Sequence, residues 1–326
     1  MIPRKDTGRW VLYGSVLQLL FVGLVGCERK SKQIWSEKPE LKVMTSFAPI
    51  YCFALNVAGD DAQVKCLLTS KGPHDHGEPT ELHLKQAEAA DLLLLNGLNI
   101  DDSFGQKIKG ASTRHELHIL ALGDLFKPDE LLEGECTHLG HEHGDKHEHP
   151  IDPHIWLGID QAKKMVAGIR DELKRLDPPH AANYDSRATI YLHKLDQLKE
   201  EGLNLLRDKT ERKILAHHDS LQYFTVPFDL HIAGYITNEG VEPGSERLKK
   251  IVADCKKYQC RIIAVEPQYP KNSAAATVLA TLLKEGIQAE YVEVDPLETA
   301  EESQLTPDLY IETMRRNLNN LAKVLR

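Results

Sequence analysis

The sequence lacks the short motifs that mark several classes of hydrolase and nucleotide-binding protein. Its 326 residues contain no HExxH, no GxSxG and no P-loop, and the HELH at 115–118 has the wrong spacing for a zinc protease. A metal-dependent hydrolase also needs an open coordination position and a positioned base. We therefore expect a protein that is not an enzyme, and keep a secreted zinc hydrolase only as a less favoured alternative.

A stretch dense in lysine and arginine is also missing, and the net charge is −9 with histidine neutral. Phosphate binding depends on a clustered basic surface, so we expect no nucleic-acid partner. A cation ligand fits this charge balance better.

Cysteines are few, and no CxxC pair occurs, so a zinc cluster held by thiolates is not supported. Apart from Cys27, the cysteines are Cys52, Cys66, Cys136, Cys255 and Cys260. In an oxidising compartment, the candidate bridges are Cys255–Cys260 and Cys52–Cys66, and Cys136 would be left over. The sequence alone does not decide the pairing.

The N-terminus has the pattern of a targeting segment. Basic residues precede an uncharged run over residues 11–26, which is shorter than a comfortable membrane span. The run ends in Leu-Val-Gly-Cys, which resembles a bacterial lipobox. We therefore predict a signal peptide at 1–26, a lipid on Cys27, a polar tether at 27–40 and an extracytoplasmic, membrane-anchored protein. A plain signal peptide or an uncleaved anchor is the alternative, and Glu28 does not decide which membrane receives the lipid.

Beyond the tether, short apolar runs alternate with helical patterns, which predicts an α/β fold with mostly parallel sheets. The expected strands are 41–46, 63–68, 91–96, 116–120, 212–216, 231–236, 261–266 and 289–294. Helices are expected at 49–59, 80–90, 160–177, 181–207, 245–257, 272–285 and 306–325.

The helix expected from residue 181 is long. Tyr184, Ala188, Tyr191, Leu195 and Leu198 repeat at helical spacing. At 1.5 Å per residue, this helix would be ~40 Å long, a length suited to a rigid strut. We therefore predict an N-terminal α/β lobe at 41–179, a linking helix at 180–208 and a C-terminal α/β lobe at 209–326. No internal repeat is visible residue by residue.

Metal-binding side chains follow several of these strands. His74 and His76 come after the strand at 63–68, His217 and His218 end the strand at 212–216, and Asp295 follows the strand at 289–294. In open α/β sheets, ligands bind outside the carboxyl ends of the strands. His154 precedes a helix and is placed to reach the same crevice. Imidazoles combined with one carboxylate suit zinc.

The motifs GPHDHGEPT, AEAADLLLLNGLNID, DPHIWLG, HDSLQYF and VDPL occur in this order from about residue 72 onward. Together they resemble the solute-binding proteins of zinc and manganese ABC importers, especially the zinc-uptake type. The resemblance covers nearly the whole chain from Leu41. It implies two α/β lobes joined by a rigid helix, a metal in the cleft between them, a membrane ABC permease as partner, and a monomer.

The resemblance also implies the metal ligands, which fall on His74, His154, His218 and Asp295 of this sequence. The segment PHDHGEPT has one residue more than the usual spacing, so His76 can replace or join His74. His217 is a rival to His218, although a structural role for it is preferred. Glu266 either supports a ligand from behind or caps the next helix.

Histidine at position 218 favours zinc over manganese, on the resemblance and on ligand softness. A manganese- or iron-binding member of the same family is the main alternative, and an adhesin is a further one.

A histidine-rich segment spans residues 138–149 and precedes His154. Its histidines are His138, His141, His143, His147 and His149. The segment has no apolar periodicity and cannot fix its own conformation by burial. Neutral imidazoles near pH 7 make it a candidate auxiliary collector or sensor of zinc. A merely solvated loop is the alternative.

Overall fold

The computed structural model describes Met1 and residues 34–36, 40–70, 72–73, 78–111, 117–134, 150–237, 243–268 and 274–326. The chain divides into two compact units, residues 1–33 and 34–326, and the described helices and strands belong to the second. Apart from Met1, the predicted signal peptide and Cys27 therefore lie outside the described residues. Within the described part, no helix combines the length and the apolarity needed to cross a membrane.

The first sheet is parallel, with its strands in the order β2-β1-β3-β4. These strands are β1 (Leu41–Phe47), β2 (Ala62–Leu68), β3 (Leu92–Leu95) and β4 (His118–Ala121). β3 consists of four buried leucines, the composition expected of a parallel strand covered on both faces.

The second sheet is also parallel, in the order β6-β5-β7-β8. Its strands are β5 (Lys213–Ala216), β6 (His231–Tyr235), β7 (Ile262–Val265) and β8 (Glu290–Glu293). Counted within its own lobe, each sheet has the strand order 2-1-3-4. The direction in which successive strands are added to the sheet reverses beside β1 in the first sheet and beside β5 in the second. Open α/β sheets bind ligands at such reversals.

The helices are α1 (Ala48–Ala58), α2 (Glu81–Ala87), α3 (Asp102–Ala111), α4 (Ile159–Leu176), α5 (Ala181–Leu206), α6 (Gln222–Thr225), α7 (Ser245–Tyr258), α8 (Ala274–Lys284) and α9 (Leu309–Val324). Each of the eight predicted strands and seven predicted helices overlaps an observed one. α3 and α6 were not predicted. Two glycines weaken the helical pattern of α3, and α6 is a single short turn.

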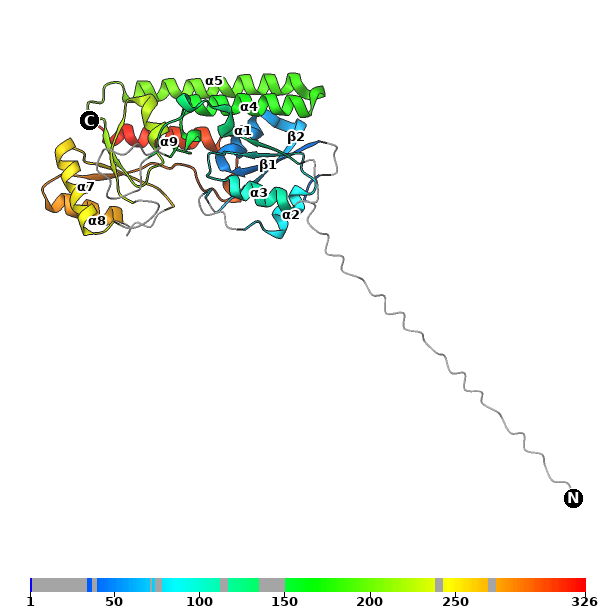
Figure 1. The fold of residues 1–326 in the computed structure, drawn as a ribbon, viewed down its shortest axis with the longest axis horizontal. Coiled ribbons are helices and arrows are strands. Elements are labelled where there is room, and N and C mark those ends of the chain that lie inside the picture. The colour runs from blue at the N-terminus through cyan, green and yellow to red at the C-terminus, as the bar shows by residue number, and fades with distance from the viewer. Residues whose placement is uncertain are drawn as a thin grey trace. The chain divides into compact units, whose positions relative to one another are not determined.

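The long helix α5 packs against both parts of the fold. Its 26 residues span about 39 Å at 1.5 Å per residue. It contacts α4 and α1 of the first lobe and α9 of the second, and Figure 1 shows it in green alongside α4. Its buried residues include those that set the predicted helical period.

One apolar core continues through both lobes. The larger cluster of buried residues joins the first sheet, α4, α5 and α9 to Ile214 and Ile262 on one face of the second sheet. The alternate residues Leu215 and Ile263 point to the other face, where they join a smaller cluster under α7 and α8. The period of two along a strand therefore places the second sheet between two cores.

Candidate metal centre

His218 and Glu266 come from neighbouring parallel strands. His218 lies two residues beyond β5, and Glu266 directly follows β7. Because parallel strands end at the same edge of a sheet, the two side chains meet there, with His218 Nδ1 and Glu266 Oε1 2.6 Å apart. Their exposed fractions are 6% and 2%. Glu266 thus holds the His218 ring from behind and leaves Nε2 facing the other way.

His154 is held in the same manner from the first lobe. Asp152 Oδ1 accepts a hydrogen bond from the His154 backbone N–H at 2.9 Å and lies 2.8 Å from His154 Nδ1. Both residues are buried. One carboxylate oxygen therefore fixes both the backbone and the ring of His154, and Nε2 is again the outward atom.

Glu298 places a carboxylate beside the Nε2 atoms of both His154 and His218. Its Oε1 lies 3.1 Å from His218 Nε2 and 3.6 Å from His154 Nε2. Among the described residues, His154, His218 and Glu298 form the one group of metal-ligand side chains whose donor atoms all lie within 4.8 Å of one another. All three are buried. Two imidazoles and a carboxylate that converge out of contact with water are a zinc-type donor set.

A polar side chain supports the carboxylates. Gln268 Nε2 donates to Glu266 Oε2 at 2.7 Å and lies 3.5 Å from Glu298 Oε2. The amide therefore links the carboxylate behind His218 to the carboxylate in front of it.

The charges of this cluster are interdependent. Burial alone would lower the pKa of His218, but the adjacent Glu266 and Glu298 carboxylates raise it well above its usual value. Burial raises the pKa of Glu266, against the opposing effect of the His218 cation. Without metal, His218 is therefore a cation near neutral pH, with each ring nitrogen directed to a carboxylate.

His217 has a different environment from His218. Its backbone carbonyl accepts hydrogen bonds from Thr237 N–H at 2.8 Å and from Thr237 Oγ1 at 3.0 Å. Burial, and then the charge of His218, lower the pKa of His217 to about 4. His217 lies outside the group of converging ligand atoms.

Asp295, the carboxylate expected from the sequence to bind the metal, has two other partners in the structure. Its Oδ2 accepts from Arg316 Nη2 at 2.8 Å, and its Oδ1 accepts from the Leu297 backbone N–H at 2.8 Å. The chain then turns at Leu297, which has a left-handed φ of 57°. Glu298 follows that turn, and its side chain reaches the histidines. Sequence reasoning missed Glu298, although the motif VDPL is followed directly by this second carboxylate.

The segments that carry His154 and Glu298 are tied together by Trp156. Trp156 Nε1 donates to Pro296 O at 2.8 Å, and the Trp156 carbonyl accepts from Tyr310 OH at 2.7 Å. Asn96, which follows β3, donates from Nδ2 to Pro153 O at 2.9 Å. These contacts fix the backbone on both sides of the histidine–carboxylate group.

The remaining histidines named from the sequence lie outside the described residues: His74, His76, His138, His141, His143, His147 and His149. The described chain before His74 runs beside Glu298. A methyl group added at Gly72 would lie 3.6 Å from Glu298 Cβ, and Ala300 N–H donates to Thr69 O at 2.9 Å.

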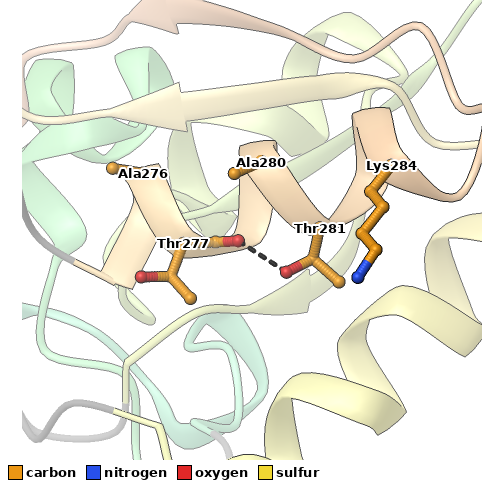
Figure 2. Close-up of a pocket in the computed structure, with 5 residues that line it drawn as sticks. All are labelled: Ala276, Thr277, Ala280, Thr281 and Lys284. Carbon is orange, nitrogen blue, oxygen red and sulfur yellow. Dashed lines mark hydrogen bonds between the residues drawn. The ribbon is translucent and has the colours of Figure 1, made fainter.

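A separate hollow of about 420 Å³ lies on α8 and is lined by Ala276, Thr277, Ala280, Thr281 and Lys284. Figure 2 shows the hydrogen bond from Thr281 Oγ1 to the Thr277 carbonyl on this face, with the Lys284 ammonium alongside. None of these side chains is an imidazole, thiol or carboxylate, so the hollow lacks the usual zinc donors.

Comparison with known proteins gives one family. The family model described as "Zinc-uptake complex component A periplasmic" matches residues 43–324. The zinc-binding protein AdcA of Streptococcus pyogenes serotype M3 is 28% identical over 306 residues, which are 90% of this chain and 57% of that protein. The chain thus spans little more than half the length of this relative. The high-affinity zinc uptake system protein ZnuA of Bacillus subtilis is 28% identical over 325 residues, with 98% of this chain and 97% of that protein covered.

Solved structures share the fold. The SBP FpvC of Pseudomonas aeruginosa, in complex with Mn2+, has a TM-score of 0.73 and 22% sequence identity, covering 88% of this chain and 98% of that one. At this identity, the likeness establishes the two-lobed α/β architecture alone. It confirms the fold class predicted from the sequence.

Proposed function

The chain belongs to the family of periplasmic zinc-uptake complex component A proteins, and from this premise we propose that it binds a zinc ion outside the cytoplasm and delivers it to a membrane ABC permease. The observation that carries the proposal is the convergence of His154 Nε2, His218 Nε2 and a Glu298 oxygen at one buried point. The names of the curated relatives, a zinc-binding protein and a zinc uptake protein, support zinc as the cargo.

We propose Glu298, rather than Asp295, as the carboxylate ligand. Asp295 is engaged by Arg316 and by the turn at Leu297, whereas Glu298 lies within reach of both imidazoles. Asp295 also lies outside the group of converging ligand atoms among the described residues.

The fourth ligand in this proposal is His74 or His76. The proximity of Gly72 to Glu298 supports it, because consecutive Cα atoms are only about 3.8 Å apart. Three imidazoles and one carboxylate close a tetrahedral zinc site and leave no position for a reacting water. The site is then one of binding rather than catalysis, as the family assignment also implies.

The donor set supports zinc over manganese. Imidazole nitrogen suits zinc, while manganese favours sites made of carboxylate, carbonyl and water oxygens. Asp152 and Glu266 strengthen this preference, because a carboxylate behind an imidazole raises its basicity as a ligand. Manganese remains the alternative cargo, since FpvC was solved with it.

We propose the histidine-rich segment as an auxiliary zinc collector. The described residues that flank it are held together, because Gly134 N–H donates to Pro150 O at 2.6 Å and Glu133 pairs with Ile151. Ile151 directly precedes Asp152, which holds His154. Ions collected by the segment would therefore be released next to the site.

The cellular setting is part of the same proposal. We propose a lipid anchor on Cys27, an extracytoplasmic location and a monomeric state. We also propose division into lobes 41–179 and 209–326, joined by the helix at 180–208. A relative named as a zinc-binding lipoprotein, AdcA of Streptococcus pneumoniae, supports the anchor.

The test is zinc stoichiometry and affinity of the chain from residue 28 onward, measured by competition with a chromogenic chelator. Wild type should bind one zinc tightly. The variant His154→Ala/His218→Ala should lose tight binding, while deletion of residues 138–149 should retain it. The matched control His118→Ala/His231→Ala removes two exposed imidazoles and should behave as wild type. Tight zinc in the first variant, together with its loss on loop deletion, would place the site in the histidine-rich segment instead.

A further inference from the structure

The end of α7 brings two cysteines together. Gln259 has a left-handed φ of 56° and ends the helix. Its N–H donates to Lys256 O at 3.4 Å, and Cys260 N–H donates to Cys255 O at 2.9 Å. This pair of bonds is the Schellman motif, in which the side chain just past the helix packs on the side chain five positions earlier. In this chain, both of those side chains are thiols.

The two thiols contact each other inside the smaller core. Each residue is only 1% exposed, and the two thiols lie close enough for each to shift the pKa of the other. Apolar neighbours such as Ile251 and Ile263 surround them. Cys260 Sγ also lies 3.7 Å from the carbonyl oxygens of Lys213 and Ile262, which are the first residues of β5 and β7.

We propose that Cys255 and Cys260 are joined by a disulfide in the exported protein, which fastens the end of α7 to the start of β7. The inference rests on the extracytoplasmic location proposed above, because disulfides persist in oxidising compartments. The other candidate pair is arranged differently, because Cys52 lies within α1 and Cys66 within β2, so that no helix-ending turn brings these two residues together.

The oxidation needs a disulfide oxidant, such as an oxidised dithiol protein or oxidised glutathione. The Cys255 thiolate attacks one sulfur of the oxidant, forms a mixed disulfide and releases one thiol. Cys260 then loses its proton and attacks Cys255 Sγ, forming the Cys255–Cys260 bond and releasing the second thiol.

The bond must form while the chain folds, because buried thiols are inert once the core has closed. Its position then matters for the metal centre. It braces the start of β7, the strand whose other end leads to Glu266 behind His218.

Peptide mapping tests the proposal directly. The full chain, exported by a bacterial host, is denatured in iodoacetamide without reductant and digested with trypsin. Lys256 and Lys257 separate the two cysteines, so the disulfide should appear as the peptide IVADCK (251–256) linked to YQCR (258–261). Prior reduction should replace this pair with two singly alkylated peptides. Alkylated IVADCK and YQCR from the unreduced sample, or linkage of either to the peptide with Cys136, would overturn the proposal.

Thermal unfolding gives an independent readout. Reductant should lower the melting temperature of wild type by about 5 °C. Cys255→Ala/Cys260→Ala should show no reductant-dependent shift, whereas the control Cys52→Ala/Cys66→Ala should keep it. A shift that persists in the first variant contradicts the proposal. If the disulfide is missing while tight zinc binding is intact, this inference fails and the proposed function stands.

Discussion

At the scale of single residues, the proposed metal centre is built from imidazoles that are each oriented by a carboxylate. Asp152 fixes Nδ1 of His154, and Glu266 fixes Nδ1 of His218. A histidine held in this way presents a defined nitrogen to an ion and loses less conformational entropy on binding. Glu298 lies in front of both rings and is the residue that distinguishes this geometry from the one expected from the sequence.

Replacing Glu298 and Asp295 one at a time tests which of these two carboxylates, both beyond the end of β8, binds the ion. We expect Glu298→Gln to weaken zinc binding roughly 100-fold or more, because a direct ligand should matter at least as much as a supporting residue. Asp295→Asn should leave affinity within about threefold and lower stability by about 1 kcal/mol, through its bonds to Arg316 and Leu297. Chelator competition and urea unfolding measure the two effects. The reverse ranking of affinities would restore Asp295 as the ligand.

Zinc binding should release a proton from His218. The raised pKa of His218 keeps it protonated near pH 7, so zinc must displace the proton on Nε2. Below that pKa, the logarithm of the zinc association constant should rise by about one for each unit of pH, and it should level off above it. Calorimetry in two buffers with different ionisation enthalpies counts the protons released.

Glu266→Gln provides the check on this prediction. It removes the carboxylate that does most to raise the pKa of His218, so fewer protons should be released at pH 7.5. Zinc affinity should fall roughly 10- to 100-fold. Glu293→Gln, at an exposed position on β8, is the control. Equal proton release from Glu266→Gln and wild type would mean that the displaced proton comes from elsewhere.

His154, His218 and Glu266 of the candidate site could be proposed from the sequence, whereas Glu298 could not, for a physical reason. His218 and Glu266 follow strands that the hydrophobic runs identify, and ligands gather at strand ends. Glu298 lies in an irregular segment beyond β8. The left-handed turn at Leu297 decides which carboxylate faces the histidines, and no periodic pattern encodes such a turn at a leucine.

At the scale of helices and strands, the apolar runs located every strand because buried parallel strands are continuously hydrophobic. α3 was missed because Gly105 and Gly110 interrupt its pattern. Gly105 is required there by packing, since an added methyl group would lie 2.3 Å from Leu95 Cδ1. A residue chosen for close approach between elements thus weakened the local helical signal.

A glycine on α5 marks where this helix meets the second lobe. An added methyl group at Gly202 would lie 2.4 Å from Phe228 Cε1 and 2.9 Å from Leu318 Cδ1. We expect Gly202→Ala to lower the free energy of unfolding by about 1–3 kcal/mol through overpacking.

Gly110→Ala on α3 is the matched control, because an added methyl group there meets nothing within 4 Å. It should leave stability unchanged or raise it by about 0.5–1 kcal/mol, as expected for alanine in a helix. Urea unfolding of both variants makes the comparison. A neutral Gly202→Ala would show that α5 is not closely packed on the second lobe.

At the scale of the molecule, the two lobes share a strand order while differing in residues. The sheets read β2-β1-β3-β4 and β6-β5-β7-β8, but the strands themselves have different side chains. The sequence therefore showed only a common alternation of strands and helices. The order of strands depends on crossovers and contacts between distant segments, which local patterns do not contain.

The shared core predicts that the lobes unfold together. In the chain from residue 28 onward, tryptophan fluorescence comes from Trp35 and Trp156, both packed in the first lobe. This fluorescence and far-ultraviolet circular dichroism of the whole chain should show the same transition midpoint, because one buried cluster joins both sheets. Zinc at about 100 times its dissociation constant should stabilise the protein by about 2.7 kcal/mol and move both midpoints equally. Two separate transitions, or a zinc effect on one probe alone, would show that the lobes are energetically independent.

Continuity of the core also affects how long an ion stays bound. Separating the lobes far enough to free a zinc ion exposes apolar surface, at about 2.5 kcal/mol for each 100 Å². Each such increment reduces the population of open molecules about 70-fold. The isolated protein should therefore release its ion slowly, with a long residence time set by rare openings. In the proposed function, rapid transfer would require the permease to bind the open form and thereby shorten that time.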